Sequence, residues 1–582
     1  MKHFKNFKVS VYFMAQGFDE TDDLKLQKEY DFIEKYAGID KIYLENFRGE
    51  DVVSKDKIKK AADFFRSKGV EVAGGMTATY KPRSESDIEK NRLFDTLCYC
   101  DEIMRAKLTE SAEQNAALFD EFILDDFFFT NCTCDECCRR KGNRSWCEFR
   151  EALMNEVSEN VIIAPAKKIN PNVKITIKFP NWRESYHGCG YDPDRERNLF
   201  DNIHTGTETR CTPHQDQHLP RYAGYSIMRF LENAAPGRNN GGWIDNFQCW
   251  SLDTYLEQAY FNIFARPKEL TLFCWQSLAG AKWLTGMGYQ LERLDKVLDE
   301  CGAPEGIPVY IPFHSNGENH IEDFLGMQGF AFETVPDFPE KEDQVFLTEA
   351  ALFDGSIFEK LSAFLEKGGS AYVTPGFAKG MDQEKWSSLS SVRFTGRKIT
   401  ADRYFVTDDP AGYYDDNKKA VFEDIQHINN SSWSLVNCGS NDYHTPLFIR
   451  DAYGKGMLYI LNTPENPAEI EYIAPSALDA VKRAMNRKGI YISGRNVSMF
   501  MYDNDTFVLY GNMKTPVHPV HVTVHMDAGK YKAELTDVID DRKVEVYKKS
   551  LSYDFKWISE YTADVIIEPG EWKVFRVSGS DN

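Results

Sequence analysis

The stretch EFILDDFFFTNCTCDECC, residues 121–138, decides the fold. It begins with an apolar, aromatic run that predicts a strand over residues 121–129, and two adjacent carboxylates, Asp125 and Asp126, interrupt this run. A long amphipathic segment follows and predicts a helix, and a further apolar run then predicts a second strand. Strand, helix and strand in this order form the repeating unit of a parallel α/β sheet.

The same unit repeats on both sides of this stretch. Short apolar runs that are each followed by a crossover number eight in roughly 300 residues, as expected of a (β/α)8 TIM barrel. We therefore predict this barrel as the catalytic domain over residues 1–303. The predicted strands are 8–15, 41–47, 70–76, 121–129, 173–180, 203–210, 243–249 and 269–275, with helices at 24–36, 57–68, 148–168 and 289–300.

The pattern changes near Pro304. Shorter strands and helices alternate from there, and they predict a flavodoxin-like α/β domain over residues 304–488. From Tyr491 onward the strands are short and frequent and are separated by turns, which predicts a small C-terminal β-sandwich over residues 489–582. Strands of the second domain are predicted at 307–311, 331–335, 349–352 and 370–374.

Composition excludes several classes of partner. The 582 residues include 69 Lys and Arg against 90 Asp and Glu, a net charge of −21 that repels nucleic acid and anionic lipid. No stretch of the sequence approaches the ~20 apolar residues that a membrane-spanning helix needs. Thirteen cysteines, an odd number, fit a reducing cytoplasmic compartment better than a disulfide framework.

Three cysteines follow the fourth predicted strand at C-x-C-x-x-C spacing: Cys132, Cys134 and Cys137. A tight loop with this spacing can direct three thiolates at one point, and thiolates favour zinc in a closed tetrahedral site. A fourth ligand is required, and Cys98 or Cys100 is expected to supply it, with Cys138 and Cys147 as further candidates. The alternative is that these thiols fill small apolar gaps.

A strand that ends in acidic residues and runs within six positions into a C-x-C-x-x-C loop, followed by a flavodoxin-like domain and a β-sandwich, resembles the glycoside hydrolase family 42 beta-galactosidases and related barrels. The resemblance covers essentially the whole chain. It implies a structural zinc held by the three loop cysteines and one upstream cysteine, and self-association as a trimer or dimer. An Asn-Glu pair closes strand four in that family. Asp125-Asp126 stands there in this chain, so Asp126 takes the acid/base place.

Barrel enzymes carry their chemistry at the C-terminal ends of the strands, where this sequence places few acids. Those considered as catalytic are Asp125, Asp126, Glu208 and Asp245. Glycoside hydrolysis needs one protonated carboxyl to release the leaving oxygen and one ionised carboxyl to attack the sugar or activate water. Neighbouring side chains on a strand point to opposite faces, so only one of Asp125 and Asp126 is expected to face the barrel axis, and Asp126 is favoured. Glu208 is favoured over Asp245 as its partner, and a structural ion pair is the alternative for each.

A second resemblance concerns the placement of the carboxylates alone. In the clan D alpha-galactosidases an aspartate closing strand four is the nucleophile, and a carboxylate on strand six is the acid/base. This arrangement implies the same pair, Asp126 and Glu208, with the roles exchanged. Both assignments stay open, as does the choice between retention and inversion.

Aromatic and polar residues near the predicted strand ends are candidates for binding substrate. An indole there could stack on a sugar ring, although core packing is an equal alternative. Polar side chains could bind hydroxyls or a negatively charged sugar, and the alternative for them is an exposed loop position. The candidates are Trp182, Trp243, Trp275, Glu45, Lys178, Arg210 and His214.

The sequence thus predicts a cytoplasmic, homo-oligomeric glycoside hydrolase that acts on a small oligosaccharide or glycoside. The alternative is a non-catalytic carbohydrate-binding or assembly protein on a degenerate glycosidase barrel. A zinc-dependent hydrolase is disfavoured, because four thiolates leave the metal no open coordination position.

Overall fold

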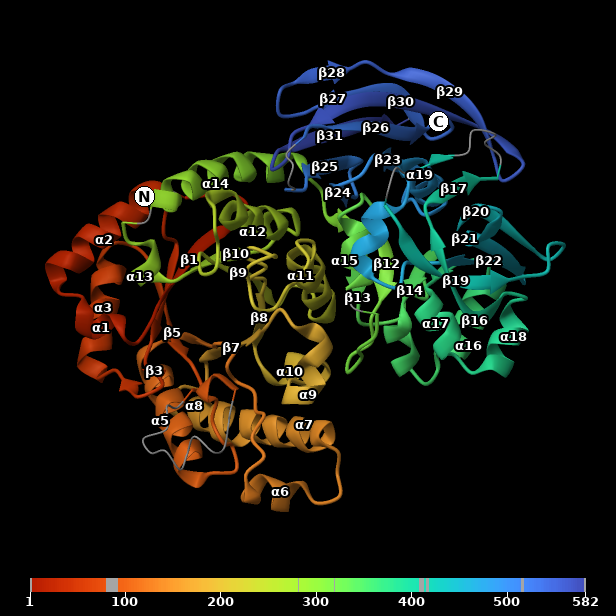
Figure 1. Ribbon diagram of the computed structural model, residues 1–582. Coiled ribbons are helices and arrows are strands. Elements are labelled where there is room, and N and C mark those ends of the chain that lie inside the picture. Colours follow the sequence, from red (N-terminus) through yellow and green to blue (C-terminus); the bar gives the residue numbers. More distant parts are fainter. Residues whose placement is uncertain are drawn as a thin grey trace. The chain divides into compact units, whose positions relative to one another are not determined.

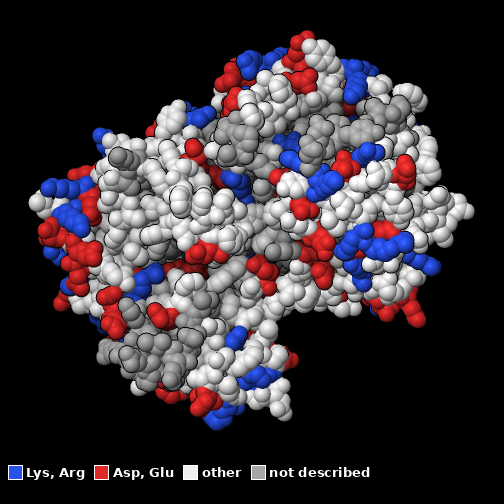
Figure 2. All heavy atoms as spheres, in the orientation of Figure 1, with Lys and Arg blue, Asp and Glu red and all other residues white. Residues whose placement is uncertain are grey.

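The computed structural model describes residues 3–79, 93–280, 282–318, 320–407, 413–414, 418–513 and 518–579. The chain forms two compact units, Met1–Leu219 with Ala223–Asp299, and Pro220–Tyr222 with Glu300–Asn582 (Figure 1). Acidic and basic side chains both occur across the face shown in Figure 2. Within the described ranges, no helix combines the length and the apolar character needed to cross a membrane.

The first unit is a closed barrel of eight parallel strands, which confirms the predicted fold class (Figure 1). Around the barrel the strands follow the order β1-β10-β9-β8-β7-β6-β5-β2, so β1 closes on β10. They are β1 (Lys8–Phe13), β2 (Lys41–Glu45), β5 (Glu71–Met76), β6 (Glu121–Leu124), β7 (Lys174–Phe179), β8 (Asn202–Gly206), β9 (Asn239–Asp245) and β10 (Glu269–Phe273).

Several helices of this unit begin where a side-chain cap satisfies the first free N–H groups. Asp22 accepts from Lys25 N at 2.8 Å, and Ser145 and Glu148 form a reciprocal capping box. The helices are α1 (Gly17–Glu20), α2 (Asp23–Tyr36), α3 (Lys55–Ser67), α5 (Glu102–Leu118), α6 (Asp135–Lys141), α7 (Trp146–Val157), α8 (Ala164–Ile169), α9 (Tyr186–Cys189), α10 (Pro193–Leu199), α11 (Ala223–Ala234), α12 (Leu252–Phe264), α13 (Trp275–Leu278) and α14 (Lys282–Glu300).

The helix predicted over 148–168 is instead α7, a π-helical segment at Ser158–Ile163, and α8. Pro165 stands at the start of α8, and a proline lacks the N–H that an α-helical bond requires. Because this donor is missing, the backbone hydrogen bonds change locally to the i→i+5 pattern of a π-helix.

The strand predicted over 243–249 lies instead at Asn239–Asp245. Its start contains Gly241 and Gly242, which look like a turn in the sequence. A Cβ on Gly241 would lie 1.8 Å from the carbonyl oxygen of Glu269, and one on Gly242 would lie 1.6 Å from Asn262 Oδ1. These glycines therefore permit close approach of β10 and α12, and the strand ends at Asp245.

The barrel interior is layered beneath the C-terminal strand ends. Near the opposite end, Lys41 pairs with Glu121 at 2.9 Å and with Glu269 at 3.5 Å. Above this pair, the rings of Tyr12 and Trp243 pack with centroids 5.0 Å apart. The ring layer closes the barrel and forms a firm base for the polar groups above it.

The second unit contains a nine-stranded sheet in the order β13-β12-β14-β15-β22-β21-β20-β17-β18, whose first five strands are parallel. These strands are β12 (Ile307–Tyr310), β13 (Phe332–Val335), β14 (Gln344–Leu347), β15 (Ser370–Val373), β17 (Arg403–Val406), β18 (Tyr413–Tyr414), β20 (Ser432–Ser440), β21 (Tyr443–Tyr453) and β22 (Gly456–Leu461). A separate pair joins β16 (Arg393–Ala401) to β19 (Ala420–Gln426). The helices are α15 (Ile321–Gly326), α16 (Ile357–Glu366), α17 (Pro375–Gly380), α18 (Gln383–Leu389) and α19 (Pro475–Ala484).

The strand predicted at 349–352 is wrong. These residues lie in a 3-10 helix, Glu349–Phe353, and the strand is β14, which ends just before it. A short apolar run has no period that separates strand from helix, which explains the error.

The C-terminal part is β-rich, as predicted, and consists of two sheets. One has the order β11-β24-β25-β31-β27-β28 and the other β23-β26-β30-β29. Apolar residues from both sheets, such as Met499, Leu509, Val524 and Phe575, share one core. The strands are β11 (Pro304–Glu305), β23 (Ile490–Ser493), β24 (Val497–Tyr502), β25 (Thr506–Gly511), β26 (Val520–Asp527), β27 (Tyr531–Asp537), β28 (Arg542–Val544), β29 (Tyr547–Tyr553), β30 (Lys556–Ile567) and β31 (Trp572–Gly579). The boundaries proposed at residues 303 and 488 stay predictions.

Candidate active site

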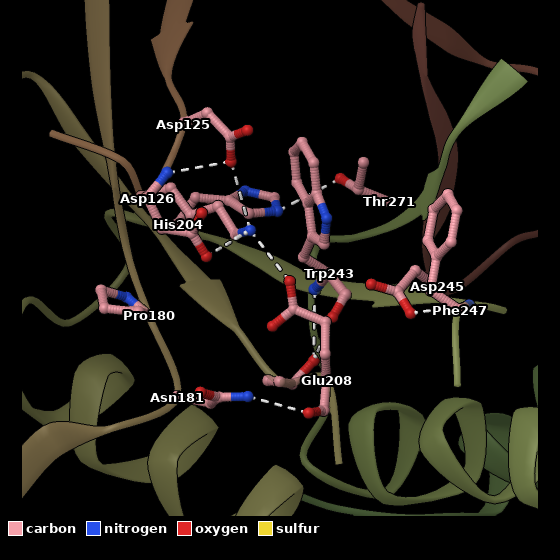
Figure 3. Close-up of polar contacts among 12 residues, drawn as sticks. Asp125, Asp126, Pro180, Asn181, His204, Glu208, Trp243, Asp245, Phe247 and Thr271 are labelled. Carbon is pink, nitrogen blue, oxygen red and sulfur yellow. Dashed lines mark hydrogen bonds and ion pairs between the residues drawn. The ribbon is translucent and has the colours of Figure 1, made fainter. Parts of the chain in front are cut away.

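The C-terminal ends of the barrel strands surround a pocket with a volume of about 230 Å³. Four carboxylates and three cations line it, together with several aromatic rings. Figure 3 shows the carboxylates with Trp243 and Phe247. The charged residues are Asp125, Asp126, Glu208, Asp245, Arg48, Lys178 and Arg210. The pocket thus brings together all four carboxylates that the sequence singled out as catalytic.

Asp125 and Asp126 both direct their carboxylates into this pocket (Figure 3). Strand β6 ends at Leu124, and the two aspartates occupy a turn in which Asp126 N donates to Asp125 Oδ1 at 2.9 Å. Lys178 Nζ donates to Asp126 Oδ2 at 2.8 Å and to Asp125 Oδ1 at 3.3 Å. The expectation that only one of them faces the barrel axis is therefore wrong, because the strand alternation has already ended.

Lys178 is the central cation of the site. Its ammonium lies 4.0 Å from the centroid of the Trp243 ring and donates to Glu208 Oε1 at 2.9 Å, besides its two aspartate partners. Burial alone would lower the pKa of Lys178, but the charges of Asp126, Glu208 and Asp125 outweigh it and raise the pKa. Lys178 is therefore a fixed positive charge that holds three carboxylates.

Glu208 follows β8 on a short segment that is tied to its neighbours. Thr207 Oγ1 donates to the carbonyl of Trp243 at 2.7 Å, and Asn181 Nδ2 donates to the carbonyl of Glu208 at 2.8 Å. A Cβ on Gly206 would lie 3.0 Å from Glu208 Oε2. The glycine leaves space beside this oxygen, and Lys178 binds the other oxygen, Oε1.

The environments of the two adjacent aspartates drive their pKa values apart. Burial raises the pKa of Asp126 to about 7; the negative charges of Asp125 and Glu208 add to this effect and Lys178 opposes it. Burial also acts on Asp125, but Lys178 and Arg48 outweigh it and hold the pKa of that carboxyl well below its usual range. One carboxyl is thus available as an acid near neutral pH while its neighbour stays ionised, a division typical of acid–base sites.

Glu45 supports the site from behind and is not among the described residues that line the pocket. It is fully buried, and it accepts from Tyr12 Oη at 2.7 Å and from Arg48 Nε at 3.0 Å. Arg48 in turn donates from Nη2 to Asp125 Oδ2 at 2.8 Å. The structure therefore corrects the substrate-binding assignment of Glu45, which instead orients Arg48, a pocket residue that the sequence did not reveal.

Asp245 ends β9 and forms a two-point ion pair with Arg210. The distances are 2.9 Å from Nε to Oδ1 and 2.7 Å from Nη2 to Oδ2. Burial raises the pKa of Asp245, and Arg210 opposes that rise. Both side chains line the pocket, but the engagement of both carboxylate oxygens matches the ion-pair alternative for Asp245.

Two of the three candidate tryptophans line the pocket. Trp182 packs edge-on against Phe129 with centroids 5.2 Å apart, and Trp243 lies beneath Lys178. Trp275 is fully buried, and its Nε1 donates to Glu29 Oε2 at 2.7 Å. Its predicted role is wrong, because β10 ends at Phe273 and the chain has entered α13 when it reaches Trp275.

His214 is also placed differently from its prediction. Its ring is exposed and stacks on Trp250 with centroids 4.2 Å apart, and it is not among the described residues that line the pocket. Lys178 and Arg210, the other two polar candidates, do line the pocket, but as partners of carboxylates.

Most of the aromatic lining was missed by sequence reasoning. Phe127 and Phe129 belong to the stretch at 121–138, but they had been assigned to a strand. The lining residues that were missed are Arg48, Phe94, Phe127, Phe129, Pro180, Asn181, Gln217, Phe247 and Phe273. Several lie one to three residues beyond a strand end, and that position is the signal that could have identified them.

Four cysteine thiols gather beside the barrel: Cys98, Cys132, Cys134 and Cys137. Their sulfurs all lie within 4.8 Å of one another, and Cys98 Sγ is 3.7 Å from the sulfurs of both Cys134 and Cys137. A tetrahedral zinc with Zn–S bonds of ~2.3 Å separates its sulfurs by about 3.8 Å, so the donor set and spacing fit this metal. Cys98 supplies the fourth thiol, and Cys100 is outside the group of four.

A pocket lined by carboxylates at the C-terminal ends of a closed (β/α)8 barrel can hold the pair of carboxyls that glycoside hydrolysis needs. The family model described as "Probable glycosyl hydrolase, catalytic domain" matches residues 1–297, and the chain belongs to this family. Residues 302–466 match the model for the second domain of the uncharacterized protein SSO3021.

The chain is also similar to one relative and to solved structures. The chain is 24% identical over 576 residues to the uncharacterized protein SSO3021 of Saccharolobus solfataricus, covering 91% of this chain and 94% of that protein. Its fold is similar to a beta-galactosidase from Rahnella sp. R3, with a TM-score of 0.63, 13% identity and coverage of 99% and 100% of the two chains. A catalytic mutant of Gan42B, a GH42 beta-galactosidase from G. stearothermophilus, gives a TM-score of 0.63 with 11% identity and 98% of each chain covered. These likenesses confirm the GH42-like fold.

Proposed function

We propose that this protein is a retaining glycoside hydrolase in which Asp126 and Glu208 are the two working carboxyls. One observation carries the proposal. Asp126 Oδ2 and Glu208 Oε1 are bound by the same Lys178 nitrogen, so these two oxygens are at most about 6 Å apart. This upper limit is below the ~6.5–9.5 Å between the carboxyls of inverting enzymes, and it admits the ~5–5.5 Å of retaining ones.

The environments of the two groups suggest their roles. Lys178 occupies Asp126 Oδ2, which leaves Oδ1 to carry the proton that its raised pKa retains near neutral pH. That proton passes to the glycosidic oxygen as the bond to the leaving group breaks. Glu208 Oε2 attacks the anomeric carbon and forms a glycosyl ester, while Lys178 stays on Oε1. Asp126, now ionised, takes a proton from water, which cleaves the ester and restores Glu208.

Asp125 and Arg48 act as positioning residues in this scheme. Asp125 contacts Lys178, while Arg48 joins Asp125 to the buried Glu45. This chain of ion pairs fixes the ammonium between the two working carboxyls. Such support is what a preorganised charged site requires.

The pH profile should reveal the acid. Because Asp126 must be protonated, kcat/KM on an alkyl glycoside should fall by about tenfold per pH unit above an apparent pKa near 7. A 2,4-dinitrophenyl glycoside of the same sugar needs no proton on its leaving group, so this alkaline limb should be weakened for that substrate. Steady-state rates between pH 5 and 9 test this prediction. If kcat/KM falls equally steeply at alkaline pH for both substrates, the result would count against Asp126 as the acid.

The activity itself is tested by a panel of 4-nitrophenyl glycosides of the common sugars in both anomers. We expect hydrolysis of one sugar in one anomer, and no hydrolysis by the Asp126→Asn, Glu208→Gln double variant. Saturable binding of a sugar without turnover by the native protein would instead favour the carbohydrate-binding alternative.

We further propose that the four-cysteine cluster holds one structural zinc ion. Cys134 directly precedes α6 and Cys137 lies in its first turn, so the metal would tie the loop after β6 to the segment that carries Cys98. Four thiolates would complete its coordination, and no catalytic step is assigned to it. None of the thirteen cysteines, all of which lie in the described residues, forms a disulfide. On this basis we propose a cytoplasmic location.

We propose that the substrate of the protein is a small carbohydrate. We also propose that the protein self-associates through the second unit. Strands β13 and β18 are the outer strands of the nine-stranded sheet, and an outer strand is where a strand of another chain can be added. Sedimentation equilibrium at micromolar concentration should give two or three times the chain mass of 66.9 kDa. A mass of one chain would contradict the proposal.

A further inference from the structure

Four phenylalanine rings form an arc along one side of the pocket, and we call it the aromatic arc: Phe94, Phe127, Phe273 and Phe247. The Phe94 and Phe127 centroids are 5.8 Å apart, and those of Phe273 and Phe247 are 5.9 Å apart. The Arg48 guanidinium joins the two pairs, since its carbon lies 5.7 Å from the Phe127 centroid and 5.8 Å from that of Phe273. The four rings and one cation therefore form a continuous surface.

The barrel topology places this arc across the pocket from the central lysine and Glu208. The rings follow or end strands β5, β6, β9 and β10, and Arg48 follows β2. Lys178 lies on β7 and Glu208 follows β8. Because β7 and β8 are adjacent in the closed barrel, the arc occupies the remaining part of the mouth, facing them.

The outer two rings of the arc are exposed although they are large and apolar. Phe94 is 59% exposed and Phe247 is 44% exposed. Phe94 has a left-handed backbone with φ of 54°, which is unfavourable for a bulky side chain. Phe247 is fixed by its N–H, which donates to Asp245 Oδ1 at 3.0 Å (Figure 3). Rings held in this way at the edge of a polar pocket point to a ligand that covers them.

The charges of the pocket define the kind of ligand. Each of the three cations that line it already contacts carboxylates: Arg48 has Asp125, Lys178 has Glu208 and both aspartates, and Arg210 has Asp245. Four carboxylates stand against these three cations in the lining. With Asp126 protonated, the other three carboxylates balance these three cations, so each cation of the described lining is already engaged by a carboxylate and an anionic group would have to displace one.

We propose that the aromatic arc is the subsite for the leaving group of the glycoside, and that it takes an uncharged group with a flat apolar face. An aryl group or the C–H face of a neutral sugar ring has this chemistry. The inference rests on the proposed function, because it assumes that the sugar to be released occupies the pocket between Asp126 and Glu208.

Non-hydrolysed ligands test the arc without requiring turnover. Phenyl, 4-carboxyphenyl and methyl 1-thioglycosides of glucose, galactose and mannose, in both anomers, would be titrated calorimetrically. For the sugar that binds, we expect the phenyl compound to bind at least ~10-fold more tightly than the methyl compound. The 4-carboxyphenyl compound should bind more weakly than the phenyl compound.

Variants then locate the effect. Phe94→Ala and Phe247→Ala should each weaken phenyl thioglycoside binding by about 5- to 10-fold and leave the methyl compound unchanged. Trp250→Ala is the matched control, because Trp250 is 70% exposed but does not belong to the described lining. Phe94→Leu keeps an apolar side chain without the aromatic ring and guards against loss of local structure.

The outcomes separate this inference from the proposed function. Equal binding of phenyl and methyl compounds, no binding of either, or variants with unchanged preference would overturn the arc even if the panel shows hydrolysis. A phenyl preference that the two alanine variants remove would support the arc even if no glycoside is hydrolysed, and the proposed hydrolysis would then fail alone.

Discussion

Asp126→Asn and Glu208→Gln should each lower kcat on an alkyl glycoside by at least ~10³-fold. Each substitution keeps the size of the side chain and removes either the proton or the charge that the transition state requires. Lys178 would keep two carboxylate partners in each variant, so the melting temperature should change little. Asp31→Asn, at an exposed position on α2, is the control and should retain native turnover.

The two losses should differ in kind. Loss of the acid at Asp126 should be partly masked on a 2,4-dinitrophenyl glycoside, whose leaving group needs no proton. Loss of the nucleophile at Glu208 should be rescued by azide entering the vacated space. Rescue at Asp126 with a glycosyl azide of inverted configuration would exchange the roles, as in the clan D arrangement. Near-native turnover by both variants would show that the pair is wrong and would move attention to Asp245.

Cys134→Ser should reduce bound zinc and lower both yield and melting temperature, by about 5 °C if ~3 kcal/mol of metal-dependent stability is lost from the barrel unit. The reason is that one missing thiolate opens a site whose four sulfurs lie within 4.8 Å of one another. Cys138→Ser is a close control, because this neighbouring thiol is exposed and outside the cluster. Elemental analysis and thermal denaturation measure both effects, and the absence of zinc from protein purified without chelator would remove the proposal.

The barrel could be predicted because each of its strands corresponds to a short apolar run in the sequence, and a crossover segment follows each run. There are two exceptions. Gly241 and Gly242 look like a turn, but they lie inside β9 because the backbone of β10 and Asn262 approach them closely. Trp275 looks like the end of a strand, but the chain has already turned into α13. Contacts with distant segments decide both cases, and a single sequence does not reveal them.

The carboxylates of the site could be predicted because this sequence has few acidic residues at the C-terminal ends of the predicted barrel strands, so the candidates were few. Their partners could not, because ion pairs depend on residues far apart in the chain. Arg48 lies 77 positions from Asp125, and Lys178 lies 52 positions from Asp126. The joint orientation of Asp125 and Asp126 was missed for a different reason: the apolar residues after them extended the predicted strand past its real end at Leu124.

The central claim is a double displacement by Asp126 and Glu208, and trapping of the covalent intermediate tests it most directly. The native protein would be treated with the 2-deoxy-2-fluoro glycoside of the sugar that the panel identifies, and its peptides mapped by mass spectrometry. We predict one fluoroglycosyl group per chain, attached to Glu208. An adduct on Asp245, or steady hydrolysis of the parent glycoside with inversion and without any adduct, would contradict the account.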